Sequence, residues 1–92
     1  MNEESSVAEV TIYTTMMCPF CARAKSLLDH KGVKYEEIDV TFSGKKRRKM
    51  TELAGGRYTV PQIFIGGEAI GGSDELVALE MGGHLDGLLG TT

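Results

Sequence analysis

The sequence contains little cysteine and proline, and it lacks tryptophan and long apolar runs. Two cysteines in 92 residues are too few for the disulfide-rich scaffold that small secreted domains use. No stretch approaches the roughly 20 apolar residues that cross a bilayer. The acidic start, MNEESSVAEV, also lacks the basic and apolar regions of a secretory signal. We therefore expect a cytoplasmic protein without a membrane partner.

Length and net charge limit the organisation further. A chain of 92 residues can bury one core, so we expect a flexible tail at residues 1–8 and a single domain at 9–92, acting as a monomer. The net charge of −3 disfavours binding to nucleic acid. No nucleic-acid partner is expected.

Alternating and helical hydrophobic patterns predict the order β-α-β-α-β-β-α. Residues 9–14 alternate and are rich in β-branched and aromatic residues, as is typical of a strand. A strand–helix–strand unit implies a right-handed parallel crossover, and a late hairpin adds an antiparallel pair, so the fold class is α/β with a four-stranded mixed sheet flanked by helices. Further strands are expected at 33–40 and in a hairpin at 61–72, and helices are expected to begin at Pro19, after the cap Ser43 and after the cap Ser73, with a last helical turn in HLDGLLG.

Cys18 and Cys21 stand where the first predicted strand gives way to the first helix. Pro19 suits the first helical position, where a missing N–H costs nothing. The free N–H groups of the first turn then point toward the Cys18 sulfur, and the helix dipole favours negative charge there, so the thiolate is stabilised. Cys21 lies one turn deeper on the same helix face. We expect Cys18 to be the exposed, attacking thiol and Cys21 to be the less acidic, resolving thiol.

The cysteine pair has two other interpretations. A structural Cys18–Cys21 disulfide would close a very short loop and add little stability. A zinc site would combine the pair with His30 and His84, but these histidines are more than fifty positions apart, unlike the paired histidines of Cys2His2 sites. A C-x-x-C motif near a βαβ pattern favours a redox pair instead, and no metal is expected.

Three separated segments together resemble the glutaredoxin family: Cys18-Pro19-Phe20-Cys21, then Thr59-Val60-Pro61, then Gly71-Gly72-Ser73-Asp74. The resemblance covers nearly the whole chain and points to small bacterial dithiol glutaredoxins. It implies a thioredoxin-like fold and a glutathione-dependent thiol–disulfide oxidoreductase. In such an enzyme Cys18 alone would reduce protein–glutathione mixed disulfides, whereas protein disulfides would need Cys18 and Cys21.

The resemblance also implies a glutathione groove. Pro61 corresponds to a cis-proline that would leave the Val60 backbone free to pair with glutathione like an added strand. The N–H groups of Ser73 and Asp74 would hold the γ-glutamyl carboxylate at a helix N-terminus, and the Asp74 side chain would meet the ammonium group. The implied glutathione-binding residues are Arg48, Thr59, Val60, Gly72, Ser73 and Asp74, and the residues supporting the active-site turn are Pro19, Phe20 (a variant of the common tyrosine) and Pro61.

Two stretches are unusual. Thr15 stands where the family commonly has a lysine near the thiolate, so one cation for the glycyl carboxylate is missing.

Five consecutive cations, Lys45–Lys49, fall in the first turns of a predicted helix, where the dipole disfavours each by a few tenths to about 1 kcal/mol. This run is interpreted as a solvated helix face, as an anion-attracting surface or, least well for a chain of this charge, as a nucleic-acid patch. By its distance from Thr59-Val60-Pro61, Arg48 matches the family position that contacts the glycyl carboxylate.

The resemblance implies several partners. They are glutathione, glutathionylated or disulfide-containing proteins such as ribonucleotide reductase, and indirectly glutathione reductase. Two alternatives stay open. One is a binding protein for a glutathione-ligated 2Fe–2S cluster, a role that favours glycine or serine in place of Pro19. The other is a redoxin recharged by thioredoxin reductase, although Ser73-Asp74 after a Gly-Gly pair favours glutathione.

Overall fold

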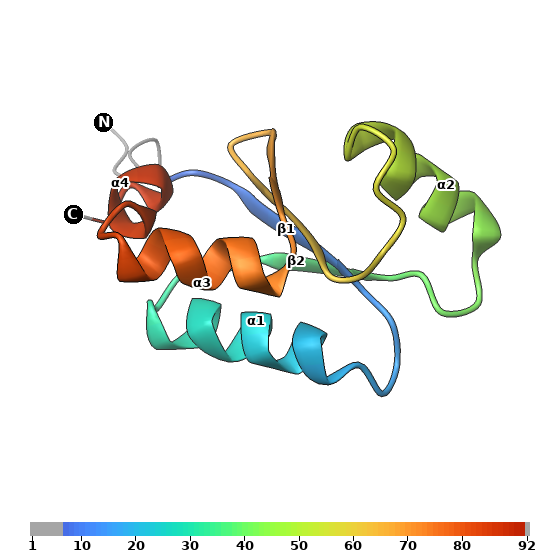
Figure 1. Cartoon of the computed structure of the whole chain (residues 1–92), viewed down its shortest axis with the longest axis horizontal. Coiled ribbons are helices and arrows are strands. Elements are labelled where there is room, and N and C mark those ends of the chain that lie inside the picture. Colours follow the sequence, from blue (N-terminus) through green and yellow to red (C-terminus); the bar gives the residue numbers. More distant parts are fainter. Residues whose placement is uncertain (1–6, 92) are drawn as a thin grey trace.

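A computed structural model, which describes residues 7–91, has the predicted order of elements, and the helical turn expected in HLDGLLG is the short helix Leu85–Leu89 (Figure 1). Of the predicted N-terminal tail, residues 1–6 lie outside the described residues, and the Ala8 N–H donates to the Leu89 carbonyl at 3.0 Å. Among residues 7–91, no helix is long and apolar enough to cross a bilayer. The elements are β1 Val10–Thr14, α1 Pro19–His30, β2 Glu36–Asp39, α2 Gly44–Leu53, β3 Gln62–Ile65, β4 Glu68–Gly71, α3 Ser73–Met81 and α4 Leu85–Leu89.

The four strands form one mixed sheet in the order β2-β1-β3-β4. Strand β1 pairs in parallel with β2, as the crossover through α1 requires, and antiparallel with β3. Strands β3 and β4 form the predicted hairpin, with Gly66 and Gly67 at the turn in the left-handed region. The fold class predicted from the sequence is therefore confirmed.

Helices cover both faces of this sheet, because side chains alternate between the two faces of each strand. On one face Ile12 and Ile63 pack with Leu28 of α1 and Leu76 of α3, and all four are fully buried. Figure 1 shows α1 and α3 lying side by side along this face. On the other face the aromatic rings of Tyr13 and Phe64 meet edge to face at 5.6 Å, and α2 covers them through the buried residues Met50 and Ala54.

The start of α3 differs from the prediction. Ser43 does cap α2, since its hydroxyl accepts the Lys46 N–H at 3.1 Å. Ser73, however, is the first helical residue of α3, and Gly72 takes the cap position. A Cβ at Gly72 would approach the Pro61 carbonyl oxygen to 3.3 Å, a tight contact that favours glycine at this crossing. The Gly72 N–H is satisfied by the Glu75 carboxylate at 2.7 Å, and the buried Ser73 hydroxyl has no partner in the structure.

The second strand is also shorter than predicted. Pairing with β1 begins at Thr11↔Glu36 and ends at Thr14↔Asp39, so residues 33–35 lie outside the strand. Gly32, at φ 74°, turns the chain after α1, and the side chain of Val33 is buried in the core. On the neighbouring strand, β1 ends at Thr14 and the chain enters the cysteine-bearing turn.

Candidate active site

Cys18 occupies the N-cap of α1, with extended backbone angles, and Pro19 takes the first helical position as predicted. The Cys21 N–H donates to the Cys18 sulfur at 3.1 Å, so the first turn of the helix is aimed at this sulfur. Both thiols are free. Cys18 is partly exposed, whereas Cys21 is only 2% exposed. The predicted difference in accessibility between the two cysteines is therefore present.

Burial separates the chemistry of the two thiols further. Desolvation raises the pKa of the Cys21 thiol to about 12, and its hydrogen bond with Cys18 acts in the same direction. The Thr15 backbone and the Lys25 charge oppose this rise in the pKa of Cys21. Cys21 is therefore a protonated thiol at neutral pH, and it can act only after it loses that proton.

Thr14, Lys25 and Glu37 form a polar cluster at the end of β1, close to Cys21. The Thr14 hydroxyl donates to Glu37 Oε2 at 2.7 Å, and Lys25 Nζ pairs with the same oxygen at 3.0 Å. The Thr14 hydrogen bond, followed by that of Lys25, lowers the pKa of Glu37, and the Glu37 hydrogen bond raises the pKa of Lys25. Both groups stay charged at neutral pH. Sequence reasoning missed this cluster, because it depends on the β1–β2 register, which pairs Glu37 with Ile12 and so places it diagonally from Thr14.

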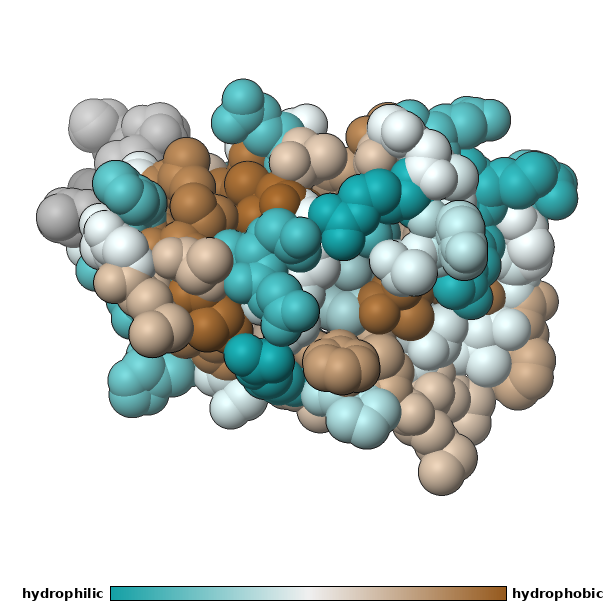
Figure 2. All heavy atoms as spheres, in the orientation of Figure 1, coloured by the Kyte–Doolittle hydropathy of each residue, from teal (hydrophilic) through white to brown (hydrophobic). Residues whose placement is uncertain are grey.

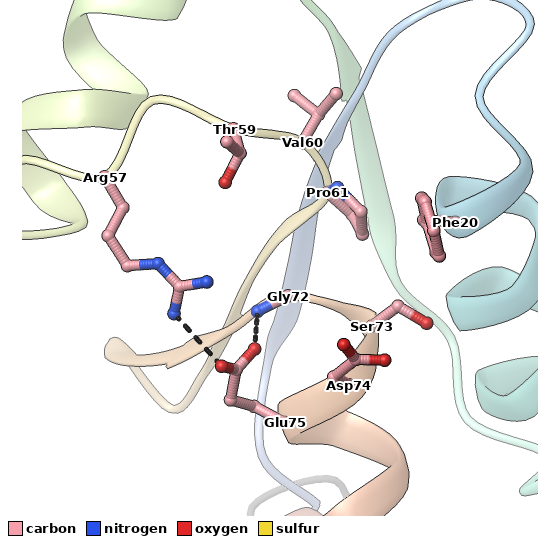
Figure 3. Close-up of a pocket in the computed structure, with 9 residues that line it drawn as sticks. All are labelled: Phe20, Arg57, Thr59, Val60, Pro61, Gly72, Ser73, Asp74 and Glu75. Atoms are coloured by element: carbon pink, nitrogen blue, oxygen red, sulfur yellow. Dashed lines mark hydrogen bonds and ion pairs between the residues drawn. The ribbon is translucent and has the colours of Figure 1, made fainter.

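A groove lies beside the cysteine turn, lined by residues from three separate parts of the chain (Figure 3). Phe20, two residues after Cys18, forms one side of it, and Arg57 lies at the opposite side. The Val60–Pro61 peptide is cis, as the resemblance implies. The groove brings together nearly all of the predicted binding residues; its lining is Phe20, Arg57, Thr59, Val60, Pro61, Gly72, Ser73, Asp74 and Glu75.

Arg57 and Glu75 are groove residues that sequence reasoning missed. Arg57 NH1 pairs with Glu75 Oε2 at 3.5 Å, while the other Glu75 oxygen accepts the Gly72 N–H (Figure 3). The Gly72 N–H, more than Arg57, lowers the pKa of Glu75. Gly71 lies at φ 116°, and a Cβ there would come within 2.8 Å of Arg57. Two sequence positions could have pointed to these residues. Arg57 lies two residues before Thr59, and Glu75 follows Ser73 and Asp74 in the first turn of α3.

The structure does not place Arg48 in this groove. Arg48 lines a separate depression between α2 and the exposed Tyr58, together with Arg47 and Thr51. Arg47 donates twice to the Tyr58 carbonyl, at 2.8 and 3.1 Å, and so ties α2 to the chain that leads into the groove. The two depressions adjoin along residues 57–59, with Tyr58 on one side and its two neighbours on the other.

The remaining predicted positions lie at the rim of the site. Thr15 is half-buried in the turn before Cys18, and Asp74 is exposed and pairs with Arg23 of α1 at 3.3 Å. Met17 is 95% exposed, and Figure 2 shows apolar side chains projecting where the β1–α1 turn lies in Figure 1. Over residues 7–91, His, Cys, Asp and Glu side chains form no group of three or more arranged to hold a metal ion.

Comparisons with known proteins agree with this geometry. Residues 10–70 match the family model described as Glutaredoxin. Glutaredoxin 3 of Escherichia coli K12 is 49% identical over 83 residues, which cover 90% of this chain and 99% of that protein. The solution structure of glutaredoxin from Brucella melitensis superposes with a TM-score of 0.81 at 51% identity, covering 94% of this chain and 92% of that one. A crystal structure of a buckwheat glutaredoxin–glutathione complex gives a TM-score of 0.80 at 28% identity, covering 89% of this chain and 76% of that one.

Proposed function

Because this chain belongs to the glutaredoxin family, it is a glutathione-dependent thiol–disulfide oxidoreductase, and we propose that Cys18 is its nucleophile and Cys21 its resolving thiol. The position of Cys18 carries this proposal. Its sulfur sits at the N-cap of α1 and accepts the Cys21 N–H at 3.1 Å, and the residue is partly exposed, whereas Cys21 is buried. Nucleophilic attack needs an accessible thiolate, and a helix N-terminus stabilises one.

Reduction of a mixed disulfide needs Cys18 alone. The Cys18 thiolate attacks the glutathione sulfur of a protein–glutathione disulfide, and the protein sulfur leaves as a thiolate that takes a proton. Cys18 is then joined to glutathione. The thiolate of a second glutathione attacks the glutathionyl sulfur, which restores Cys18 and forms glutathione disulfide. We propose that glutathione reductase recycles this product.

Reduction of a protein disulfide uses both cysteines. Cys18 attacks first and forms a mixed disulfide with the substrate. Cys21 then loses its proton and attacks the Cys18 sulfur, so a Cys18–Cys21 bond forms as the bond to the substrate breaks. The substrate leaves fully reduced. Two glutathione molecules return the enzyme to the dithiol form.

The groove is proposed as the glutathione site. The cis Val60–Pro61 peptide leaves the Val60 backbone available for strand-like pairing with the cysteinyl residue. The N-terminus of α3, at Ser73 and Asp74, offers N–H groups to the γ-glutamyl carboxylate. Arg57, which lines the same groove, adds a positive charge at this end. The buckwheat relative, solved as a complex with glutathione, supports this assignment.

Two cysteine variants test the proposed roles. A glutathionylated peptide is offered with glutathione, and turnover is followed through coupled glutathione reductase. Cys18→Ser should abolish turnover, because no other described thiol is accessible. Cys21→Ser should keep substantial activity, because the mixed-disulfide route does not use Cys21. Equal loss in both variants would show that the route through Cys18 alone is wrong.

A further inference from the structure

Half of the ten lysines and arginines of this chain lie in one run, Lys45–Lys49 of α2. Between residues 7 and 91, none of these five cations forms an ion pair with a carboxylate. Four of the other five do so, namely Arg23, Lys25, Lys31 and Arg57. The rest of the chain carries five basic residues against thirteen acidic ones. The molecule is therefore divided into a basic helix end and an acidic remainder.

The fold uses one of these five side chains, that of Arg47. Cations at a helix N-terminus are disfavoured by the helix dipole. Among residues 7–91, Arg47 is the one side chain of the run that forms a hydrogen bond, and it donates twice to the Tyr58 carbonyl. Lys45, Lys46 and Lys49 are exposed, and Figure 2 shows hydrophilic side chains projecting at the end of the molecule formed by α2. Their positions are consistent with a role outside the folding of the chain.

One hydrogen bond links the cysteine turn to the segment that leads into the basic run. The Met16 N–H donates to the Thr41 hydroxyl at 2.8 Å, which joins the turn before Cys18 to the residues that lead into α2. Thr41 is two residues from Ser43, the cap of α2. Phe42, between them, is 90% exposed. Exposed Phe42 and the start of α2 therefore follow within three residues of the segment that is bonded to this turn.

We propose that Lys45, Lys46 and Lys49 form a docking surface, here called the basic surface, for an acidic segment beside the reacting cysteine of a protein substrate. This inference rests on the proposed function, and it specifies the class of substrate as proteins with an acidic segment beside the reacting cysteine. An acidic segment is repelled by the acidic remainder of the molecule and attracted at the basic surface, so it approaches in the orientation that brings its sulfur to Cys18. Such steering raises association rates by about 10- to 1,000-fold at low salt.

Two glutathionylated peptides test the basic surface. They differ only in their flanking residues, which are glutamates in one and glutamines in the other. The wild-type protein should show a kcat/KM about tenfold higher for the acidic peptide at low salt, and added salt should remove the preference. Changing Lys45→Gln, Lys46→Gln and Lys49→Gln together should bring the ratio of the two kcat/KM values to within about twofold of one. Glutamine keeps the helix propensity close to that of lysine, and circular dichroism checks the fold.

Lys34→Gln is the matched control, because Lys34 is an exposed cation away from α2. It should keep the preference for the acidic peptide. Lys49→Gln alone tests the basic surface if the triple variant folds poorly. It should reduce the preference for the acidic peptide by less than the triple variant does. Equal kcat/KM for both peptides in the wild type would overturn the basic surface, and so would displacement of the acidic peptide by an equimolar single-stranded oligonucleotide. Failure to turn over either peptide would instead overturn the proposed function.

Discussion

At the scale of single residues, the two cysteines differ because of where the first turn of α1 places them. Cys18 caps the helix at the surface, and Cys21 points into the core, where burial raises its pKa to about 12. A thiol with such a pKa is almost entirely protonated near neutral pH. Cys21 therefore does not compete with Cys18 for the first attack.

This difference predicts how the second step depends on pH. The reduced wild-type protein is mixed with glutathione disulfide, and closure of the Cys18–Cys21 bond is followed by acid quenching and mass spectrometry. Below the pKa of Cys21, each pH unit raises its thiolate fraction about tenfold. The closure rate should therefore keep rising from about pH 7 to about pH 9. Cys21→Ser, which stops at the mixed disulfide, is the control, and a closure rate that is constant over this range would contradict the assignment.

Sequence alone could predict this residue pair, because the position of a cysteine before a helix-starting proline fixes which sulfur faces the N–H groups. It could not predict the cap of α3. A serine after Gly-Gly is a good cap by type, yet Gly72, which lies close to the Pro61 carbonyl, takes the cap position one residue earlier. That approach exists only once the hairpin and α3 are folded.

At the scale of elements, the loop at residues 57–60 and helix α2 place their arginines in two different depressions. Arg57 lines the groove beside the start of α3, and Arg48 lies in the adjoining depression on α2. The order of strands and helices was predictable from hydrophobic periodicity. The placement of these two side chains was not, because Arg57 meets Glu75, and Arg48 lies beside Tyr58, only in the folded chain.

Arg48 and Arg57 are expected to contact different carboxylates of glutathione, the glycyl and the γ-glutamyl carboxylate respectively. Arg57→Ala and Arg48→Ala should each raise the KM for glutathione about two- to fivefold, the effect expected for an exposed charge contact. With the glycyl ethyl ester of glutathione, Arg48→Ala should change KM little, because the carboxylate that Arg48 is proposed to meet is absent. Arg57→Ala should still raise it, since the γ-glutamyl end is intact.

The hydroxyethyl disulfide assay gives these KM values, with Lys34→Ala as the control for loss of an exposed cation. An unchanged KM for glutathione in Arg48→Ala would remove Arg48 from the site. An unchanged KM in Arg57→Ala would show that Arg57 does not bind glutathione, and that the N-terminus of α3 alone holds the γ-glutamyl carboxylate.

At the scale of the whole molecule, the sheet brings three segments that are distant in the sequence to the same end of its strands. The cysteine turn follows β1, the cis-proline precedes β3, and the Gly-Gly pair joins β4 to α3. The resemblance to glutaredoxins predicted that these segments meet. The contacts of Glu37, Arg57 and Glu75 were missed, because they depend on strand register and on the crossing at Gly71 and Gly72.

The central claim is that Cys18 is the sulfur that exchanges with glutathione. The most direct measurement is to treat the Cys21→Ser and Cys18→Ser proteins with glutathione disulfide and to locate the bound glutathione by peptide mapping. We predict rapid, nearly complete modification of Cys18 in the first protein and little modification of buried Cys21 in the second. Rapid modification of Cys21, or an unmodified Cys18, would contradict the account.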